Sequence, residues 1–146
     1  MSHRVHCREV SDSDWVASVP KLVEAICNSP SRMICDIDVE ATLAHFMAVA
    51  TRGGAYIVKE KYLVVFDRYK LWYAPTKDII EEKIVLCIYP ENPGSMFDVV
   101  RFLIEQRDYL EANHLVIGDF LHTNQEKYGR VLTKLGLTKI NSVYAC

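Results

Sequence analysis

The feature of this chain that most constrains its fold is a strand, helix, strand passage between residues 84 and 117. The run Lys83-Ile-Val-Leu-Cys-Ile-Tyr89 is almost entirely apolar, which is typical of a strand buried on both faces, and Pro90 ends it. A long helix is predicted over Ser95–Ala112, because apolar residues recur there with the helical period. His114–Ile117 is then a second, short buried strand. Such a passage predicts a right-handed crossover between two parallel neighbours.

The other periodic segments predict three more helices and an antiparallel meander. The first helix is expected to begin near Val19, because Pro20 interrupts its apolar stripe of Val16, Val19, Leu22, Val23 and Ile26. The remaining expected elements are an edge strand Val5–Val10, a helix Val39–Thr51 with its apolar face on Val39, Leu43, Phe46, Met47 and Ala50, strands Ala55–Val58 and Tyr62–Phe66, a helix Asn124–Leu135 and a last strand Leu137–Tyr144. The fold class is therefore mixed α/β. We expect one domain over residues 1–146, with a central mixed sheet flanked by about four helices.

Composition excludes several classes of function. Lys plus Arg total 17 and Asp plus Glu 19, so a formal charge of −2 gives no bulk attraction for nucleic acid or an anionic membrane. The six glycines form neither a dinucleotide fingerprint nor a phosphate-binding Walker loop. The five cysteines contain no Cys-x-x-Cys pair, which indicates reduced thiols and no metal site. With no apolar leader or span, the expected location is the cytoplasm.

The order of elements resembles that of the GNAT (Gcn5-related N-acetyltransferase) superfamily. Three segments carry the resemblance: the opening Val5-His-Cys-Arg-Glu-Val-Ser-Asp-Ser-Asp-Trp15, the strand Ile84–Tyr89 with Pro90 before a long helix, and the tail from Asn124 to Leu137. In the tail, Lys134-Leu-Gly-Leu137 is similar to the Lys-x-Gly-Phe stop that ends the fourth helix of this family.

The resemblance implies that acetyl-CoA or another acyl-CoA binds where two neighbouring strands splay apart. It implies a pyrophosphate site at the start of the third helix, where backbone N–H groups and the helix dipole favour an anion. The cofactor-binding residues implied here are Ile88, Tyr89, Asn92, Gly94, Ser95, Met96 and Asn124. The catalytic candidates are Tyr128 and Glu82, the latter because a general base of the family often precedes the central strand. Glu81 and Glu82 are adjacent, so only one of them can face a cleft.

Two departures from the family pattern predict that this activity is weak or lost. Pro93, Met96 and Asp98 stand where the family's phosphate-binding loop has Gln or Arg, Gly, and Gly or Ala. Proline has no N–H to donate, and the Asp98 carboxylate would repel phosphates. Leu132 stands where the family often has its tyrosine general acid, and Tyr128 lies one turn earlier.

Aromatic and basic residues gather in the meander between positions 56 and 73. They are Tyr56, Lys59, Lys61, Tyr62, Phe66, Arg68, Tyr69, Lys70, Trp72 and Tyr73. An ordinary sheet with a basic, aromatic outer face explains this set, and a stacking platform for single-stranded nucleic acid is a weaker alternative. The Arg68–Tyr73 end should project beyond the first two helices, so Trp72 and Tyr73 are predicted to be exposed interface residues.

Two functions follow from these observations. One is an acyl-CoA-dependent N-acyltransferase with degenerate motifs. The other is a non-catalytic module of the same fold that binds a protein partner or self-associates, for example a small viral (phage) structural or host-modulating protein in the virion or host cytoplasm.

Overall fold

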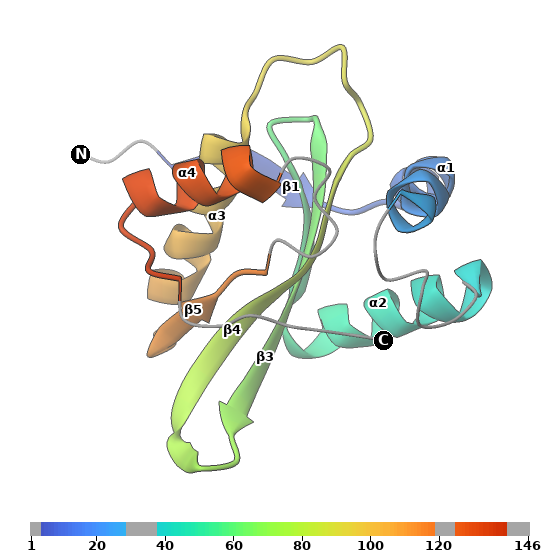
Figure 1. The fold of residues 1–146 in the computed structure, drawn as a ribbon. Coiled ribbons are helices and arrows are strands. Elements are labelled where there is room, and N and C mark those ends of the chain that lie inside the picture. The colour runs from blue at the N-terminus through green and yellow to red at the C-terminus, as the bar shows by residue number, and fades with distance from the viewer. Residues whose placement is uncertain (1–3, 29–37, 119–124, 140–146) are drawn as a thin grey trace.

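The protein has a mixed α/β fold built on one five-stranded sheet (Figure 1). The computed structural model describes residues 4–28, 38–118 and 125–139. Their elements, in chain order, are β1 (Cys7–Glu9), α1 (Asp12–Cys27), α2 (Val39–Arg52), β2 (Gly54–Val58), β3 (Tyr62–Leu71), β4 (Ala74–Cys87), α3 (Met96–Tyr109), β5 (His114–Val116) and α4 (Gln125–Lys134). The predicted last strand lies mostly outside the described residues, and positions 137–139 form no strand.

The strands lie side by side in the order in which they occur along the chain. β1 to β4 form an antiparallel meander, with β1 at the edge as predicted. β5 pairs with β4 in parallel, from Ile79 opposite His114 to Glu81 opposite Val116. The predicted parallel crossover through α3 is therefore confirmed, whereas β5 is only partly buried because His114 is exposed.

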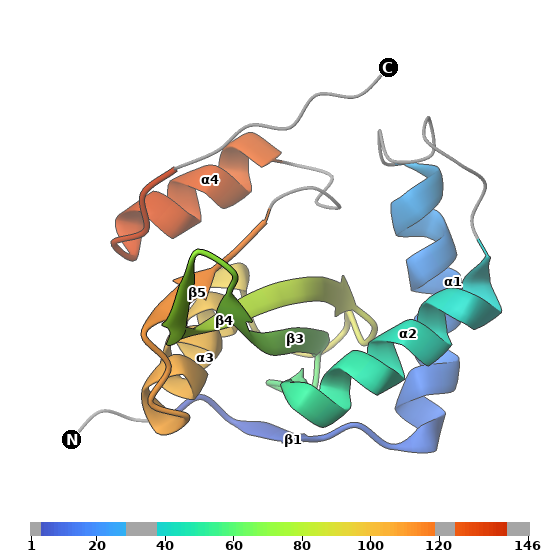
Figure 2. The ribbon, with the colours of Figure 1, turned by 90° about the horizontal axis from the view of Figure 1, so that it is seen from below.

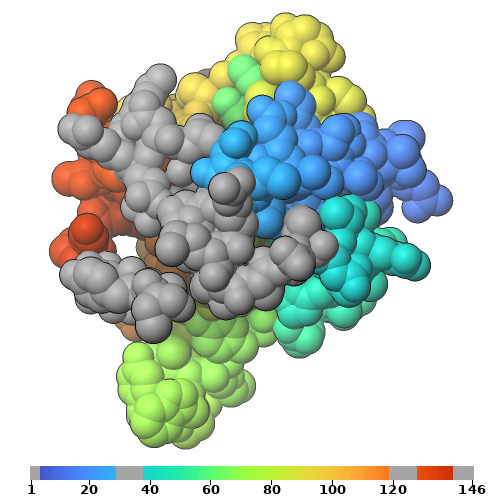
Figure 3. Space-filling model, turned by 45° about the vertical axis from the view of Figure 1, so that its right-hand side comes forward, coloured from blue at the N-terminus to red at the C-terminus, as the bar shows by residue number. Residues whose placement is uncertain are grey.

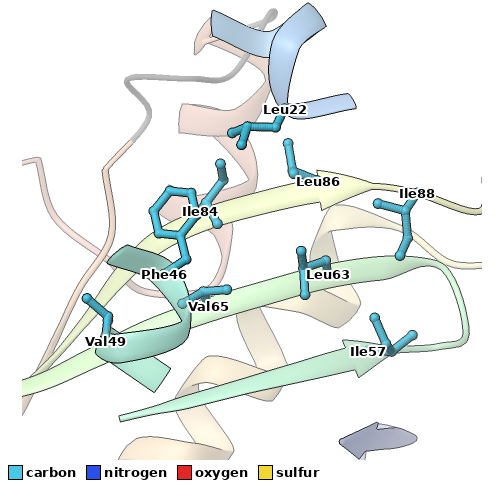
Figure 4. Packing of buried hydrophobic residues seen from close by; sticks show 9 residues of the cluster. All are labelled: Leu22, Phe46, Val49, Ile57, Leu63, Val65, Ile84, Leu86 and Ile88. Carbon is cyan, nitrogen blue, oxygen red and sulfur yellow. The ribbon is translucent and has the colours of Figure 1, made fainter. Parts of the chain in front are cut away.

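Both faces of the sheet are apolar and each is covered by helices. Leu63 and Val65 of β3 face α1 and α2, while Val64 and Phe66 face α3. Figure 2 shows α1 and α2 on one side of the sheet and α3 and α4 on the other. Figure 4 shows the packing on the first side, made by Leu22, Phe46, Val49, Ile57, Leu63, Val65, Ile84, Leu86 and Ile88. Because successive side chains of a strand point to opposite faces, β3 contributes to both cores.

β4 is longer than the apolar run indicated, and it contains a bulge. It begins at Ala74 rather than Lys83, because its polar first half is held by pairing with β3. Phe66 pairs with Glu82 and Val65 with Ile84, so Lys83 is an extra residue in the ladder. A bulge bends a strand and increases its local twist. The bend follows directly after Glu81, the last residue paired with β5.

α1 begins seven residues earlier than predicted. The Ser11 side chain and the Asp14 carboxylate cap its N-terminus reciprocally, with Ser11 N–H donating to Asp14 Oδ2 at 2.8 Å. Pro20 lies inside the helix, but it and Val16 are both exposed, so the missing hydrogen bond is on the solvent side. The predicted stripe was wrong at Val16, which is 72% exposed, whereas Leu22 is buried as predicted and Ile26 packs against the same core.

α2 matches its predicted bounds closely, and Gly53 ends it as expected. Its buried face is rotated from the prediction. Val49 is buried, whereas Met47, which was predicted to face the core, is 48% exposed.

A buried carboxylate joins α1 to the two ends of the meander. Asp14 is 1% exposed and accepts hydrogen bonds from Arg8 Nη1 at 2.6 Å and from the Tyr89 hydroxyl at 2.6 Å. The hydrogen bond from the Arg8 guanidinium holds the pKa of Asp14 well below its usual range. Arg8 also binds Glu60 in the turn between β2 and β3, with Nε 2.8 Å from Oε1.

We expect this group to make the protein sensitive to acid. A carboxyl whose pKa is lowered by folding contributes stability above its unfolded pKa of about 3.9 and loses that contribution as pH falls toward the folded pKa. Between pH 5 and pH 2, the wild-type protein should lose roughly 1–2 kcal/mol more stability than Asp14→Asn, as measured by urea denaturation. Asp12→Asn, an exposed change in the same helical turn, is the control and should keep the wild-type slope. Parallel slopes for wild type and Asp14→Asn would contradict this role.

Candidate functional site

Glu82 and Tyr128, the two catalytic candidates, lie together on the sheet face covered by α3 and α4. The Tyr128 hydroxyl donates to Glu82 Oε2 at 3.2 Å, and the two residues are 3% and 8% exposed. Glu82 pairs with Phe66, whose side chain faces α3, so Glu82 faces that side as well. Tyr128 is held there because it packs with Val131 of α4 and Val100 of α3. The pair lies next to the bulge, where β4 parts from β5.

The chemistry available to this pair is proton transfer. A buried carboxylate that keeps one oxygen hydrogen-bonded to a phenol is held in one orientation, and carboxylates of this kind act as general bases or acids. Glu81 points to the opposite face, as the alternation predicted, and there accepts hydrogen bonds from Tyr69 Oη at 2.5 Å and Lys83 Nζ at 3.2 Å. Burial and this bond to Glu81 raise the pKa of Tyr69.

Beyond Glu81, the edge of β4 that faces away from β3 presents backbone N–H and C=O groups. Ile88 N–H donates to the Lys61 carbonyl at 3.0 Å, on the β3 side. In an antiparallel pair the backbone groups of successive residues point to opposite sides, so those of Val85 and Cys87 point away from β3. Within the described residues, no strand pairs with this part of the edge. An extended ligand with amide groups could bind there as a neighbouring strand would.

The loop predicted to hold the pyrophosphate is bonded instead to the turn between β2 and β3. Asn92 Nδ2 donates to the Glu60 carbonyl at 2.5 Å, and Lys61 Nζ donates to the Gly94 carbonyl at 3.1 Å. Tyr89 N–H donates to the Lys61 carbonyl at 3.1 Å, and Tyr89 Oη binds Asp14. The side chains of Asn92 and Tyr89, which the resemblance assigns to cofactor binding, therefore make hydrogen bonds within the protein instead.

A carboxylate already lies at the N-terminus of α3. Asp98 Oδ2 accepts from the Ser95 N–H at 2.8 Å, in the capping arrangement that a helix start favours. The same position would attract a phosphate. Because an anion from the chain itself lies there, the residues present do not fit the pyrophosphate site that the resemblance implies.

The other predicted cofactor residues occupy structural positions. Ile88 is buried against α1 and α2, and Met96, the first residue of α3, packs between that helix and its neighbours. Gly94 has a φ of +150°, and a Cβ there would meet Lys59 Cβ at 3.2 Å, so the tight loop requires glycine. Leu132 packs beside Tyr128 and Val131 in α4. Asn124 lies outside the described residues.

Trp72 and Tyr73 are exposed, as predicted. They are the two turn residues of the hairpin between β3 and β4, since Leu71 pairs with Ala74. Trp72 is 89% and Tyr73 67% exposed, and their rings lie perpendicular with centroids 5.2 Å apart. Figure 1 shows this end of the hairpin projecting beyond the helices.

The sequence did not indicate an open depression of about 310 Å³ beside the start of β2, at the β1 edge of the sheet. It is lined by Glu9, Val10, Trp15, Met47, Ala50, Gly53, Gly54, Ala55 and Tyr56. These residues come from the junctions of four elements, β1, α1, α2 and β2, and no motif in the sequence joins them.

None of the helices in the described part of the chain is long and apolar enough to cross a membrane. No group of three or more His, Cys, Asp or Glu residues suited to a metal ion occurs among the described positions. No protein-family model matches the sequence, and no curated protein matches it.

Proposed function

We propose that this protein is a GNAT-like protein that binds an acyl thioester weakly and has little or no ordinary acetyltransferase activity. The observation that carries the proposal is the length of β4 that has no strand beside it within the described residues. β5 pairs with β4 over only Ile79–Glu81, whereas β4 continues through a bulge to Cys87 and leads into α3. An unpaired length of β4 supports the acyl-CoA site that the sequence resemblance implies.

The edge of β4 supports binding of the pantetheine arm rather than of the nucleotide. The backbone groups of Val85 and Cys87 suit an extended chain of amides. The nucleotide end has no matching support, because Asp98 caps α3 and the loop is bonded to Glu60 and Lys61. The pantetheine arm should therefore contribute most of the binding free energy.

Glu82 and Tyr128 are the groups that a residual reaction would use. Acyl-CoA supplies an activated acyl group when it is bound. The Glu82 carboxylate can accept the proton that an amine loses as it attacks, and Tyr128 orients that carboxylate through the 3.2 Å hydrogen bond.

The test compares acetyl-CoA with acetyl-pantetheine, which lacks the nucleotide, by isothermal titration calorimetry. The wild-type protein should bind both with similarly weak affinity. Asp98→Asn should raise the affinity for acetyl-CoA by about 2- to 5-fold and leave the affinity for acetyl-pantetheine unchanged. The reason is that removing one charge at a helix terminus changes the binding free energy of an anion by roughly 0.3–1 kcal/mol. Asp108→Asn removes the same charge near the other end of α3 and should change neither affinity.

Two outcomes would contradict the proposal. Absence of binding of both thioesters at millimolar concentration would exclude a thioester site. Tight binding of acetyl-CoA that does not respond to Asp98→Asn would contradict the argument that Asp98 obstructs the nucleotide.

A second candidate function is that of a non-catalytic binding module. The observation that favours it is the exposure of Trp72 and Tyr73 at the projecting turn of the hairpin. Large exposed aromatic residues in contact with each other mark interaction sites in soluble proteins.

A further inference from the structure

We propose that the protein self-associates by inserting Trp72 of one copy into the depression lined by Trp15, Met47 and Gly53 of a second copy. The inference rests on the second candidate function, for which it names the partner. It uses two surfaces at separate places on the chain, one projecting and one concave.

The projecting surface is the hairpin tip, Leu71–Ala74. Tight turns are usually made of Gly, Asn, Asp or Pro, each of which eases the backbone or forms local hydrogen bonds. Here both turn positions carry large rings, and neither has a positive φ. The tip projects as a separate lobe in Figure 3, where it is the light green segment at the bottom. Within the described residues, each of the two rings makes its aromatic contact with the other ring. The monomer therefore gains little from the two rings of this turn.

The concave surface can accept a single aromatic ring with one polar atom. The depression is open to solvent and has a volume of about 310 Å³, about twice the roughly 150 Å³ of an apolar cavity that holds benzene. Met47 offers a half-exposed, adaptable side chain to the depression. Glu9 lines the same depression and can accept the indole N–H, a donor that needs a partner when it is buried.

The charges around the two surfaces are complementary. From Arg68 to Asp78 the hairpin carries three basic side chains and one acidic, and Lys70 and Lys77 are exposed. The depression carries Glu9, and the first turn of α1 beside it carries the exposed Asp12. Opposite charges on facing surfaces favour encounter and fix orientation.

The contact has to join two molecules. β3 is continuous from Phe66, which pairs with Gly54 in the wall of the depression, to Leu71 at the tip. Five residues of extended strand separate the tip from that wall, and the paired ladder to β4 directs the tip away from it. A two-fold arrangement would form the contact twice and close a dimer.

Sedimentation velocity over about a hundredfold range of protein concentration tests the proposal. The wild-type protein should show a mass that rises with concentration. Trp72→Ala should weaken association at least about tenfold, as expected for an aromatic anchor. Met47→Lys places a positive charge in the depression at an exposed position and should weaken association as strongly. Tyr109→Ala, which removes an equally exposed aromatic side chain from the end of α3, is the control and should leave association unchanged.

Mixing the two weakened variants gives the most specific result. Trp72→Ala retains the depression and Met47→Lys retains the tip, so their mixture should form a heterodimer with one intact contact at concentrations where neither variant associates alone. A mixture that stays monomeric would overturn the proposed pairing of tip and depression. A wild-type protein that is monomeric at every concentration would overturn self-association, and the thioester titration is unaffected by either result.

Discussion

Replacing Gly53 by alanine is expected to lower the free energy of unfolding by more than about 3 kcal/mol. Gly53 ends α2, and its N–H donates to the Val49 carbonyl at 3.1 Å. A Cβ at this position would lie 2.1 Å from the Phe66 carbonyl oxygen and 2.9 Å from the Asp67 carbonyl carbon. Both atoms belong to the backbone of β3, which is paired with β2 and β4 and cannot shift locally. The helix end or the strand must therefore move.

Gly129→Ala is the matched control, measured in the same urea denaturation series. Gly129 lies within α4, and a Cβ there would meet nothing within 4 Å. Because alanine favours a helix over glycine by about 0.8–1.0 kcal/mol, this change should increase stability by about that amount. If Gly53→Ala proved as stable as the wild type, α2 could not approach β3 as closely as the structure describes.

Leu103→Ala should lower stability by about 2–5 kcal/mol through lost burial and the cavity left behind. Leu103 of α3 is fully buried with Phe102 and Val99 against the sheet face that includes Val64 and Phe66. Leu110→Ala is the control at the end of the same helix, where the side chain is only partly buried and the loss should be smaller. A loss below about 1 kcal/mol for Leu103→Ala would mean that this face of α3 is wrongly assigned.

The elements that depend on local pattern were predictable. The apolar run before Pro90 and the long periodic helix after Ser95 indicated the parallel crossover, because few topologies connect two such strands. The alternation from Tyr62 to Phe66 assigned the two faces of β3 for the same local reason.

The features that depend on contacts between distant residues were not predictable. Asp14, which caps α1 together with Ser11, also binds Arg8 and Tyr89, and Tyr89 is 75 residues away. The first half of β4 is too polar to be identified as a strand without its partner β3.

For the candidate site, Glu82 and Tyr128 were each selected separately from the sequence. Only the fold brings together these side chains, which are 46 residues apart. The depression lined by Trp15 and Met47 has no local signal at all.

The chain order of the strands has a consequence for synthesis on the ribosome. The meander β1 to β4 and the helices α1 and α2, which cover one of its faces, are complete once Cys87 has been made. The helix α3, which covers the other face, is not complete until Tyr109, 22 residues later. At about 5–20 residues per second, the opposite face, with Val58, Val64 and Phe66, stays uncovered for roughly 1–4 s. During this interval the nascent chain presents an apolar sheet face to its surroundings, which makes it a substrate for chaperones that bind exposed apolar segments.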